Sequence, residues 1–122
     1  MTKKILCIED DEVMINLISR KLSQEGYEVH IARDGVEGLE MIKTVKPDLI
    51  LLDIVMPRMD GMEVMEKINE DEEMKKIPIV IISNSGQPVE IKRIKELGAK
   101  DWLIKTEFDP KEVIEKVVKH IK

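Results

Sequence analysis

Asp53 directly follows the apolar run at residues 49–52, and a run of that kind predicts a buried strand. A buried carboxylate costs several kcal/mol unless it is ion-paired, hydrogen-bonded or bound to a metal ion. Other polar side chains follow apolar runs in the same way. They are Glu9, Asp10 and Asp11 after residues 5–8, Ser83, Asn84 and Ser85 after residues 79–82, and Lys105 after residues 102–104. Side chains of these types suit metal binding and phosphoryl chemistry.

The acids Glu9, Asp10 and Asp53 predict a cation site, because clustered carboxylates repel one another unless a hard cation with oxygen ligands lies between them. Mg²⁺ fits best, since it takes one or two protein carboxylates and keeps positions for water and a phosphate oxygen. The Lys105 ammonium and the Ser83 hydroxyl can bind phosphoryl oxygens. Ser83 has no evident base, so Asp53 is the predicted nucleophile, and its attack would form an acyl phosphate.

The runs before these residues are apolar on both faces, which is typical of parallel strands covered by helices. Residues 27–32 instead alternate apolar and polar side chains, which predicts an edge strand. Between the runs, apolar side chains recur at spacings of three or four and predict five helices. Strands that alternate with helices predict a doubly wound α/β domain, whose functional cleft lies beyond the carboxyl ends of the strands.

Helix boundaries are marked by residues with known capping preferences. Asp34, Asp60 and Asp109 each precede a glutamate by three positions, as an N-cap residue does in a capping box. Gly26 and Gly98 stand where the first and fourth helices should end, and glycine is the usual left-handed cap. These signals agree with the predicted elements.

The composition is that of one globular domain, with 122 residues, 43% hydrophobic and 37% charged. No window approaches the ~18 apolar residues of a membrane span, which predicts a cytoplasmic protein without a membrane anchor.

The single cysteine, Cys7, is predicted to pack in the core. A lone cysteine without a disulfide partner suits a reducing compartment. A net charge of -5 disfavours nucleic acid as a partner. His30 and His120 lack ligand-spaced neighbours, so we predict solvent-facing histidines and no zinc site.

Four motifs carry a family resemblance: "CIEDDE", "LILLDIVMPRMDGMEV", "PIVIISNSG" and "LGAKDWLIK", with 30 residues from Asp53 to Ser83 and 52 from Asp53 to Lys105. In this order and at these spacings the chain resembles the receiver domains of two-component response regulators, including the single-domain chemotaxis regulator. The resemblance covers the whole chain. It implies a flavodoxin-like (βα)5 fold with the sheet order 2-1-3-4-5. It also implies one receiver domain over residues 1–122, with no output domain.

The resemblance implies roles for individual residues. Asp53 would accept a phosphoryl group from a histidine kinase or a histidine phosphotransfer protein, and Lys105 would pair with that group. Asp10, Asp53 and the backbone carbonyl of Val55 would bind Mg²⁺ directly, while Glu9 would act through water. Ser83 would follow the phosphoryl group on activation, and Trp102 would occupy the aromatic switch position.

Three positions depart from the family pattern. Thr106 stands where the family usually has a proline with a cis bond, and a cis bond to a non-proline residue costs ~2.5–4 kcal/mol, so the Lys105–Thr106 bond is expected to be trans. Trp102 is bulkier than the usual Tyr or Phe. Val55 offers no group to orient a hydrolytic water, which predicts slow self-dephosphorylation.

Several interpretations stay open. The leading hypothesis is a phosphorylation-controlled switch, not an enzyme, whose output is the surface formed by the helix around residues 91–97, the strand 102–104 and the helix around residues 113–121. Its partner would be an unknown protein target or a phosphorelay protein, and the domain a monomer or a phosphorylation-dependent homodimer. The alternatives are a phosphorylation-independent interaction module and a metal-dependent phosphohydrolase, which would want an acid at Val55. Asp11 is equally well explained as a helix cap, Trp102 as a packing residue, and Lys92, Lys95, Lys116 and Lys119 as a solvated face.

Overall fold

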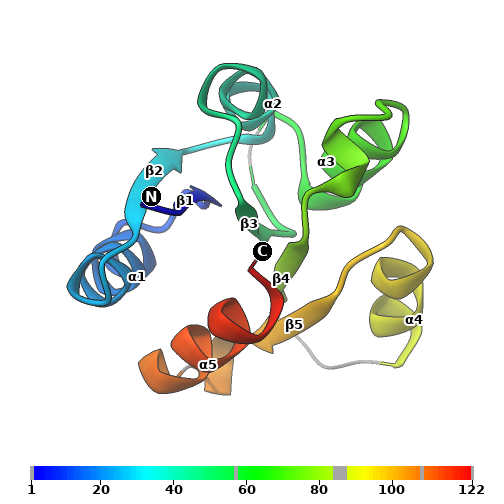
Figure 1. Cartoon of the computed structure of the whole chain (residues 1–122). Helices are drawn as coiled ribbons and strands as arrows, with labels where there is room; N and C mark the ends of the chain where they lie inside the picture. Colours follow the sequence, from blue (N-terminus) through cyan, green and yellow to red (C-terminus); the bar gives the residue numbers. More distant parts are fainter. Residues whose placement is uncertain (1, 57, 84–87, 108, 122) are drawn as a thin grey trace.

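Five parallel strands form one sheet in the order β2-β1-β3-β4-β5 (Figure 1). The computed structural model describes residues 2–56, 58–83, 88–107 and 109–121, so Asn84 and Ser85 lie outside the described residues. The strands are β1 (Lys4–Ile8), β2 (Glu28–Ala32), β3 (Leu49–Asp53), β4 (Ile79–Ser83) and β5 (Asp101–Ile104). The sheet order that the family resemblance implies is therefore confirmed.

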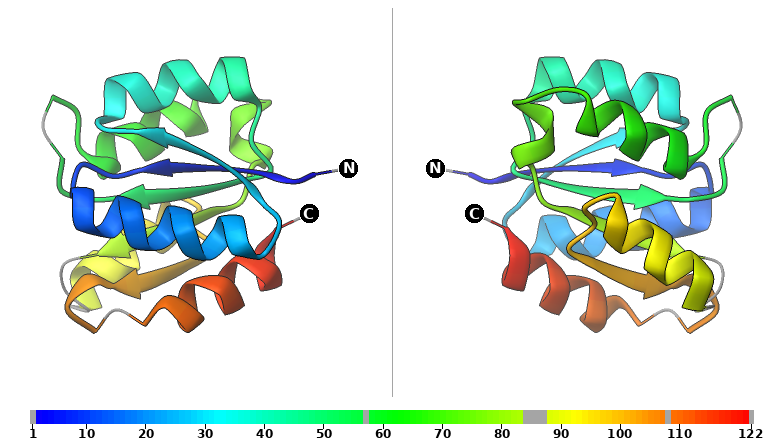
Figure 2. Two further views of the ribbon diagram at one scale, coloured as in Figure 1. Left: turned by 90° about the vertical axis from the view of Figure 1, so that its left-hand side faces the viewer. Right: turned by 90° about the vertical axis from the view of Figure 1, so that its right-hand side faces the viewer.

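Helices lie on both faces of the sheet. They are α1 (Glu12–Gln24), α2 (Gly35–Val45), α3 (Gly61–Asn69), α4 (Pro88–Glu96) and α5 (Pro110–His120), with short 3₁₀ turns η1 (Met74–Lys76) and η2 (Lys105–Glu107). Figure 1 shows α1 and α5 against one face and α2, α3 and α4 against the other. None of the described helices is long and apolar enough to cross a membrane. In Figure 2 the start of β1 and the end of α5 lie at one end of the molecule. The carboxyl ends of the strands lie at the opposite end.

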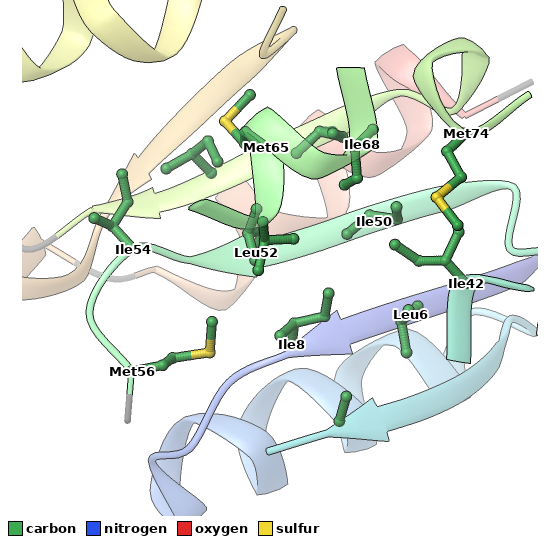
Figure 3. Packing of buried hydrophobic residues seen from close by; sticks show 14 of the residues in the cluster. Leu6, Ile8, Ile42, Ile50, Leu52, Ile54, Met56, Met65, Ile68 and Met74 are labelled. Atoms are coloured by element: carbon green, nitrogen blue, oxygen red, sulfur yellow. The ribbon is translucent and has the colours of Figure 1, made fainter. Parts of the chain in front are cut away.

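The two faces of the central strands are buried in separate apolar clusters, which explains the continuous apolar runs. Leu6 and Ile8 of β1 and Leu52 of β3 lie in the apolar cluster under α2 and α3, with Ile42 near Leu6 and Met65 near Leu52 (Figure 3). The intervening residues of the same strands face α1 and α5; these are Ile5, Cys7, Leu49 and Leu51. Cys7 is buried and free, as predicted. The carboxyl ends of these strands therefore meet at one edge of a sheet that is covered on both faces.

The predicted helix caps are present. The side chains of Asp34 and Asp60 accept hydrogen bonds from the backbone N–H three residues later, and Asp109 accepts one from the backbone of Lys111. Gly26 and Gly98 have φ of +92° and +98°, the left-handed region that glycine enters without strain. The exposed and half-buried side chains of β2 agree with its predicted place at the sheet edge.

Helix α5 is joined to the edge strand β5 by a polar cluster at Asp101. The Lys116 Nζ lies 2.9 Å from Asp101 Oδ1, and the His120 Nε2 lies 3.0 Å from Asp101 Oδ2. Lys116 also donates a hydrogen bond to the Trp102 carbonyl. The predictions that His120 faces solvent and that Lys116 belongs to a solvated face are therefore wrong. Lys116 and His120 lie next to the buried side chains of α5, Val113 and Val117. These pack in one cluster with Leu103 of β5, the strand that also carries Asp101.

Candidate functional site

The parallel register brings three of the sequence-predicted residues to one edge of the sheet. Asp53 of β3 lies opposite Ile82 of β4, so Ser83 extends one position beyond it. Ser83 in turn lies opposite Ile104 of β5, and Lys105 follows directly. Asp53 and Ser83 are fully buried. The edge therefore gathers an acid, a hydroxyl and an ammonium from neighbouring strands.

Three carboxylates meet at this edge. One oxygen from each of Glu9, Asp10 and Asp53 lies within 4.8 Å of the others. Glu9 and Asp53 are buried, whereas Asp10 is exposed. Among the described residues, the Glu9 Oε2 and the Asp53 Oδ2 are buried oxygens without a hydrogen-bond partner. Buried polar atoms nearly always have a partner, so these two oxygens mark a place for a cation or a donor.

Lys105 supplies positive charge to the acid cluster. Its Nζ lies 3.0 Å from Glu9 Oε1, 3.5 Å from Asp53 Oδ2 and 3.9 Å from Asp11 Oδ2. Burial disfavours the charged form, but the hydrogen bond to Glu9 and the charge of Asp53 outweigh it and raise the pKa of Lys105. The side chain is 21% exposed and is directed toward the carboxylates. The ammonium can therefore meet a ligand that enters between them.

The carboxyl group of Asp53 is hard to ionise in this buried, acidic environment. Burial and the neighbouring negative charge of Glu9 raise the pKa of Asp53 to about 7, while Lys105 and the Val55 N–H act in the opposite direction. The positive charge of Lys105 is thus not enough to offset burial and the repulsion between the clustered carboxylates. A further cation would be attracted to this site.

Asp11 caps helix α1. Its Oδ1 accepts hydrogen bonds from the backbone N–H groups of Val13 and Met14, at 2.9 and 3.3 Å. Its own N–H donates to the Glu9 Oε1 at 3.1 Å. The helix-cap interpretation of Asp11 is therefore confirmed, and its N–H also helps to hold the Glu9 carboxylate in place.

The segment between β3 and α3 is fixed at both ends. The Val55 N–H donates to Asp53 Oδ1 at 3.3 Å, and the Gly61 N–H donates to the Ile54 carbonyl at 2.7 Å. Arg58 has a left-handed φ of 68°, and its Nη1 lies 3.3 Å from the Oδ2 of Asp34, the N-cap residue of α2. Sequence reasoning missed this ion pair because the two residues are distant in the chain. The contact fastens the segment that carries Val55.

Ser83 has a partner that the sequence gave no reason to expect. Its Oγ donates a hydrogen bond to the Glu90 Oε1 in the first turn of α4. Glu90 is half-buried and stands seven positions after Ser83. An acid in the first turn of a helix is common, so composition alone does not distinguish Glu90 from a solvated residue.

Trp102 lies on β5 between two lysines. The Lys95 Nζ of α4 is 4.7 Å from the centre of the indole ring, and the Lys116 Nζ of α5 is 5.7 Å from it. The side chain is half-buried and packs against the apolar cluster under α2, α3 and α4. Cation–π contacts of this kind stabilise the ring at the edge of the sheet.

The bond from Lys105 to Thr106 is trans, as predicted.

A protein-family model for the response regulator receiver domain matches residues 5–118. The chain belongs to this family. Receiver domains are signalling domains without turnover of a separate substrate, so the phosphohydrolase alternative is wrong. Recognition from the four sequence motifs is confirmed.

Two relatives illustrate the range of the family. The receiver domain is 38% identical over 113 residues to the alkaline phosphatase synthesis transcriptional regulatory protein PhoP of Bacillus subtilis, covering 93% of this chain and 46% of PhoP. It is 38% identical over 122 residues to the chemotaxis protein CheY of Treponema pallidum, covering 98% of this chain and 83% of CheY. The chain thus spans about half the length of PhoP and most of the length of CheY.

Solved structures agree with this fold. The chemotaxis response regulator CheY4 of Vibrio cholerae superposes with a TM-score of 0.92 at 28% identity, over 99% of this chain and 100% of that one. The Mn²⁺-bound form of the response regulator Rcp1 gives a TM-score of 0.80 at 28% identity, over 94% of this chain and 88% of that one. The receiver domain therefore shares the CheY-like arrangement of strands and helices throughout.

Proposed function

We propose that this receiver domain is a phosphoacceptor switch in which Asp53 takes a phosphoryl group from a histidine kinase or a histidine phosphotransfer protein. The observation that carries the proposal is the environment of Asp53. Its Oδ2 is buried at a strand end without a hydrogen-bond partner among the described residues, and Lys105 Nζ lies 3.5 Å away. A carboxylate placed in this way can act as a nucleophile toward phosphorus, with positive charge beside it.

The proposed transfer moves one phosphoryl group from nitrogen to oxygen. A carboxylate oxygen of Asp53 attacks the phosphorus of a phosphohistidine, the P–O bond forms as the P–N bond breaks, and the leaving imidazole takes up a proton. Asp53 must be ionised to attack. Lys105 and the Ser83 hydroxyl would then bind oxygens of the phosphoryl group.

We propose Mg²⁺ as the cofactor. Asp10, Asp53 and the Val55 carbonyl would bind it directly, and Glu9 would act through water. The chemistry of the acid cluster and its two unpartnered buried oxygens support this assignment, because oxygen ligands and net negative charge suit a hard cation. The Mn²⁺-bound form of Rcp1 supports it by similarity. When bound, Mg²⁺ supplies positive charge to the phosphoryl oxygens.

The proposed output is a change in the surface formed by α4, β5 and α5, with Ser83 and Trp102 as switch residues. A groove of about 410 Å³ opens on this surface; its lining consists of Pro88, Ile91, Lys92, Lys95, Trp102 and Ile104. The target would be another protein or a phosphorelay protein, and the receiver domain would bind it as a monomer or as a phosphorylation-dependent homodimer.

The net charge of -5 argues against direct contact with nucleic acid, and the free Cys7 supports a cytoplasmic location.

Intact-mass analysis after incubation with acetyl phosphate tests the proposal. We expect one phosphoryl adduct on the native protein that requires Mg²⁺ and is absent from Asp53→Asn. Asp109→Asn is the matched control, because Asn also caps a helix and the same charge is removed away from the site. Absence of the adduct from the native protein, with Mg²⁺ binding confirmed separately, would favour a phosphorylation-independent interaction module.

A further inference from the structure

The hydrogen bond from Ser83 to Glu90 joins the end of β4 to the start of α4. The Ser83 side chain is fully buried, and its Oγ donates to the Glu90 carboxylate. Glu90 itself is half-buried. A hydrogen bond to a charged acceptor is roughly twice as strong as one between neutral groups, so this contact has a substantial effect on where the hydroxyl points.

The hydroxyl of Ser83 has a single proton to donate. Under the proposed function, the Ser83 hydroxyl donates its hydrogen bond to an oxygen of the phosphoryl group on Asp53. The hydroxyl cannot donate to Glu90 and to the phosphoryl group at once. The two acceptors therefore compete for the same donor, and the strength of the Glu90 contact affects the balance between the two states.

We propose that Glu90 is a positioning residue that retains the Ser83 hydroxyl in the unphosphorylated state and thereby sets how readily the domain is activated. The inference rests on the proposed function and adds to it a residue outside the acid cluster. Because coupling is reciprocal, a phosphoryl group that accepts the hydrogen bond of Ser83 also weakens the contact between the end of β4 and Glu90.

The contacts of α4 indicate which part of the helix then moves. Its C-terminal half is fastened to α3, since Arg93 Nη2 lies 3.2 Å from Glu66 Oε1 and the Asn69 amide donates to the Leu97 carbonyl at 2.6 Å. The first turn is linked to the sheet through Glu90. Loss of the Ser83–Glu90 hydrogen bond would therefore release the N-terminal half of α4 while the C-terminal half stays attached to α3. The contact of Lys95 with the Trp102 ring belongs to the attached half.

The affinity for beryllofluoride, a stable phosphoryl analogue, at saturating Mg²⁺ tests the proposal by calorimetry. Glu90→Ala is expected to bind the analogue at least about fivefold more tightly than the native protein, the low end of typical allosteric coupling. Glu90→Gln keeps an acceptor without the charge, and a gain of about twofold is expected. The control, Glu96→Ala, removes an exposed acid from the same helix and should leave the affinity unchanged.

A double-mutant cycle separates positioning from a structural effect. In a Ser83→Ala background the donor is missing, so Glu90→Ala should give no further gain. An equal gain in that background, or no gain in the Ser83 background, would overturn the role of Glu90. Should Glu90→Ala fail to fold, Glu90→Gln carries the same cycle. A native protein that does not bind beryllofluoride at all would instead contradict the proposed function, and the inference would fall with it.

Discussion

The Asp53 Oδ2 and the Lys105 Nζ lie 3.5 Å apart, and within the described chain that oxygen accepts no hydrogen bond. The ammonium instead donates to Glu9 at 3.0 Å. Lys105 therefore offsets the charge of Asp53 without occupying its free oxygen. Under the proposed function, this arrangement leaves the attacking oxygen of Asp53 open and keeps the ammonium beside the incoming phosphoryl group.

Removal of Lys105 should destabilise the metal-free protein. We expect Lys105→Met to lower the free energy of unfolding by about 1–3 kcal/mol at pH 8, because buried acids lose their charge partner. Mg²⁺ should restore most of the loss. Urea unfolding with and without Mg²⁺ measures both effects, with Lys100→Met, an exposed lysine, as the control. Equal losses in the two variants would contradict this account.

The raised pKa of Asp53 predicts a pH dependence of stability. The folded protein binds a proton at Asp53 up to about pH 7, whereas the unfolded chain releases it near 3.8. Stability of the metal-free native protein should therefore fall as pH rises from about 4 to 7 relative to Asp53→Asn, which cannot titrate there. Urea unfolding in EDTA at pH 4, 5, 6 and 8 would reveal the trend. A difference that is independent of pH would refute it.

Gly61 lies where α3 begins, against the end of β3 that carries Asp53. A Cβ at this position would meet the Asp53 carbonyl oxygen at 2.5 Å and the Ile54 Cα at 2.7 Å. Gly61→Ala should therefore cost about 1–3 kcal/mol and weaken Mg²⁺ binding, because backbone must shift to relieve the contacts. Unfolding and Mg²⁺ titrations measure the effects. Gly26→Asn, at an open left-handed position, should leave Mg²⁺ affinity intact.

The Asp101 cluster should stabilise the protein only above acid pH. Burial opposes ionisation of Asp101, but hydrogen bonds from Lys116 and His120 outweigh it and lower its pKa below 3.8. Its contribution is present above the unfolded value and is lost as pH falls through the folded value. Asp101→Asn should cost about 1.5 kcal/mol at pH 7 and nothing well below pH 3.8. Thermal unfolding at several pH values, with Asp48→Asn as comparison, tests this expectation.

Val55 should lengthen the life of the phosphorylated state. Its side chain is 59% exposed beside Asp53 and has no group that can orient a water for attack on the acyl phosphate. Val55→Asn should increase the rate of dephosphorylation by about tenfold or more, since positioned polar groups contribute 10²–10⁴-fold in favourable cases. Decay of the phosphoryl adduct, followed by intact mass, gives the rate. A lifetime unchanged by the substitution would show that Val55 does not limit hydrolysis.

Features that depend on nearby residues in the chain were predictable. The N-cap roles of Asp34 and Asp60 follow from local spacing, and the apolar runs identify strands buried on both faces. The carboxyl edge brings Asp53, Ser83 and Lys105 together because parallel strands end on the same side. The order of the strands came from the family resemblance, since periodicity alone does not specify which strands pair.

Features that depend on how helices rotate against the sheet were not predictable. Lys116 and Lys92 look alike in the sequence, yet one contacts Asp101 and the other lines a groove on the far side of β5. Glu90 reaches Ser83 only because α4 starts beside the end of β4. Glu9 was expected to act through water, and the structure also gives it a direct contact with Lys105. Such pairs depend on tertiary geometry that local patterns do not encode.

The contact between Glu9 and Lys105 joins residues 96 positions apart. Ribosomes add about 5–20 residues each second, so Asp53 is synthesised roughly 3–10 s before Lys105, 52 residues later. A growing chain carries the acids of the cluster before their ammonium exists. Copies terminated before β5 would thus expose acidic strand ends without the lysine that pairs with them. Under the proposed function, the site becomes competent to accept a phosphoryl group only after Lys105 has been synthesised.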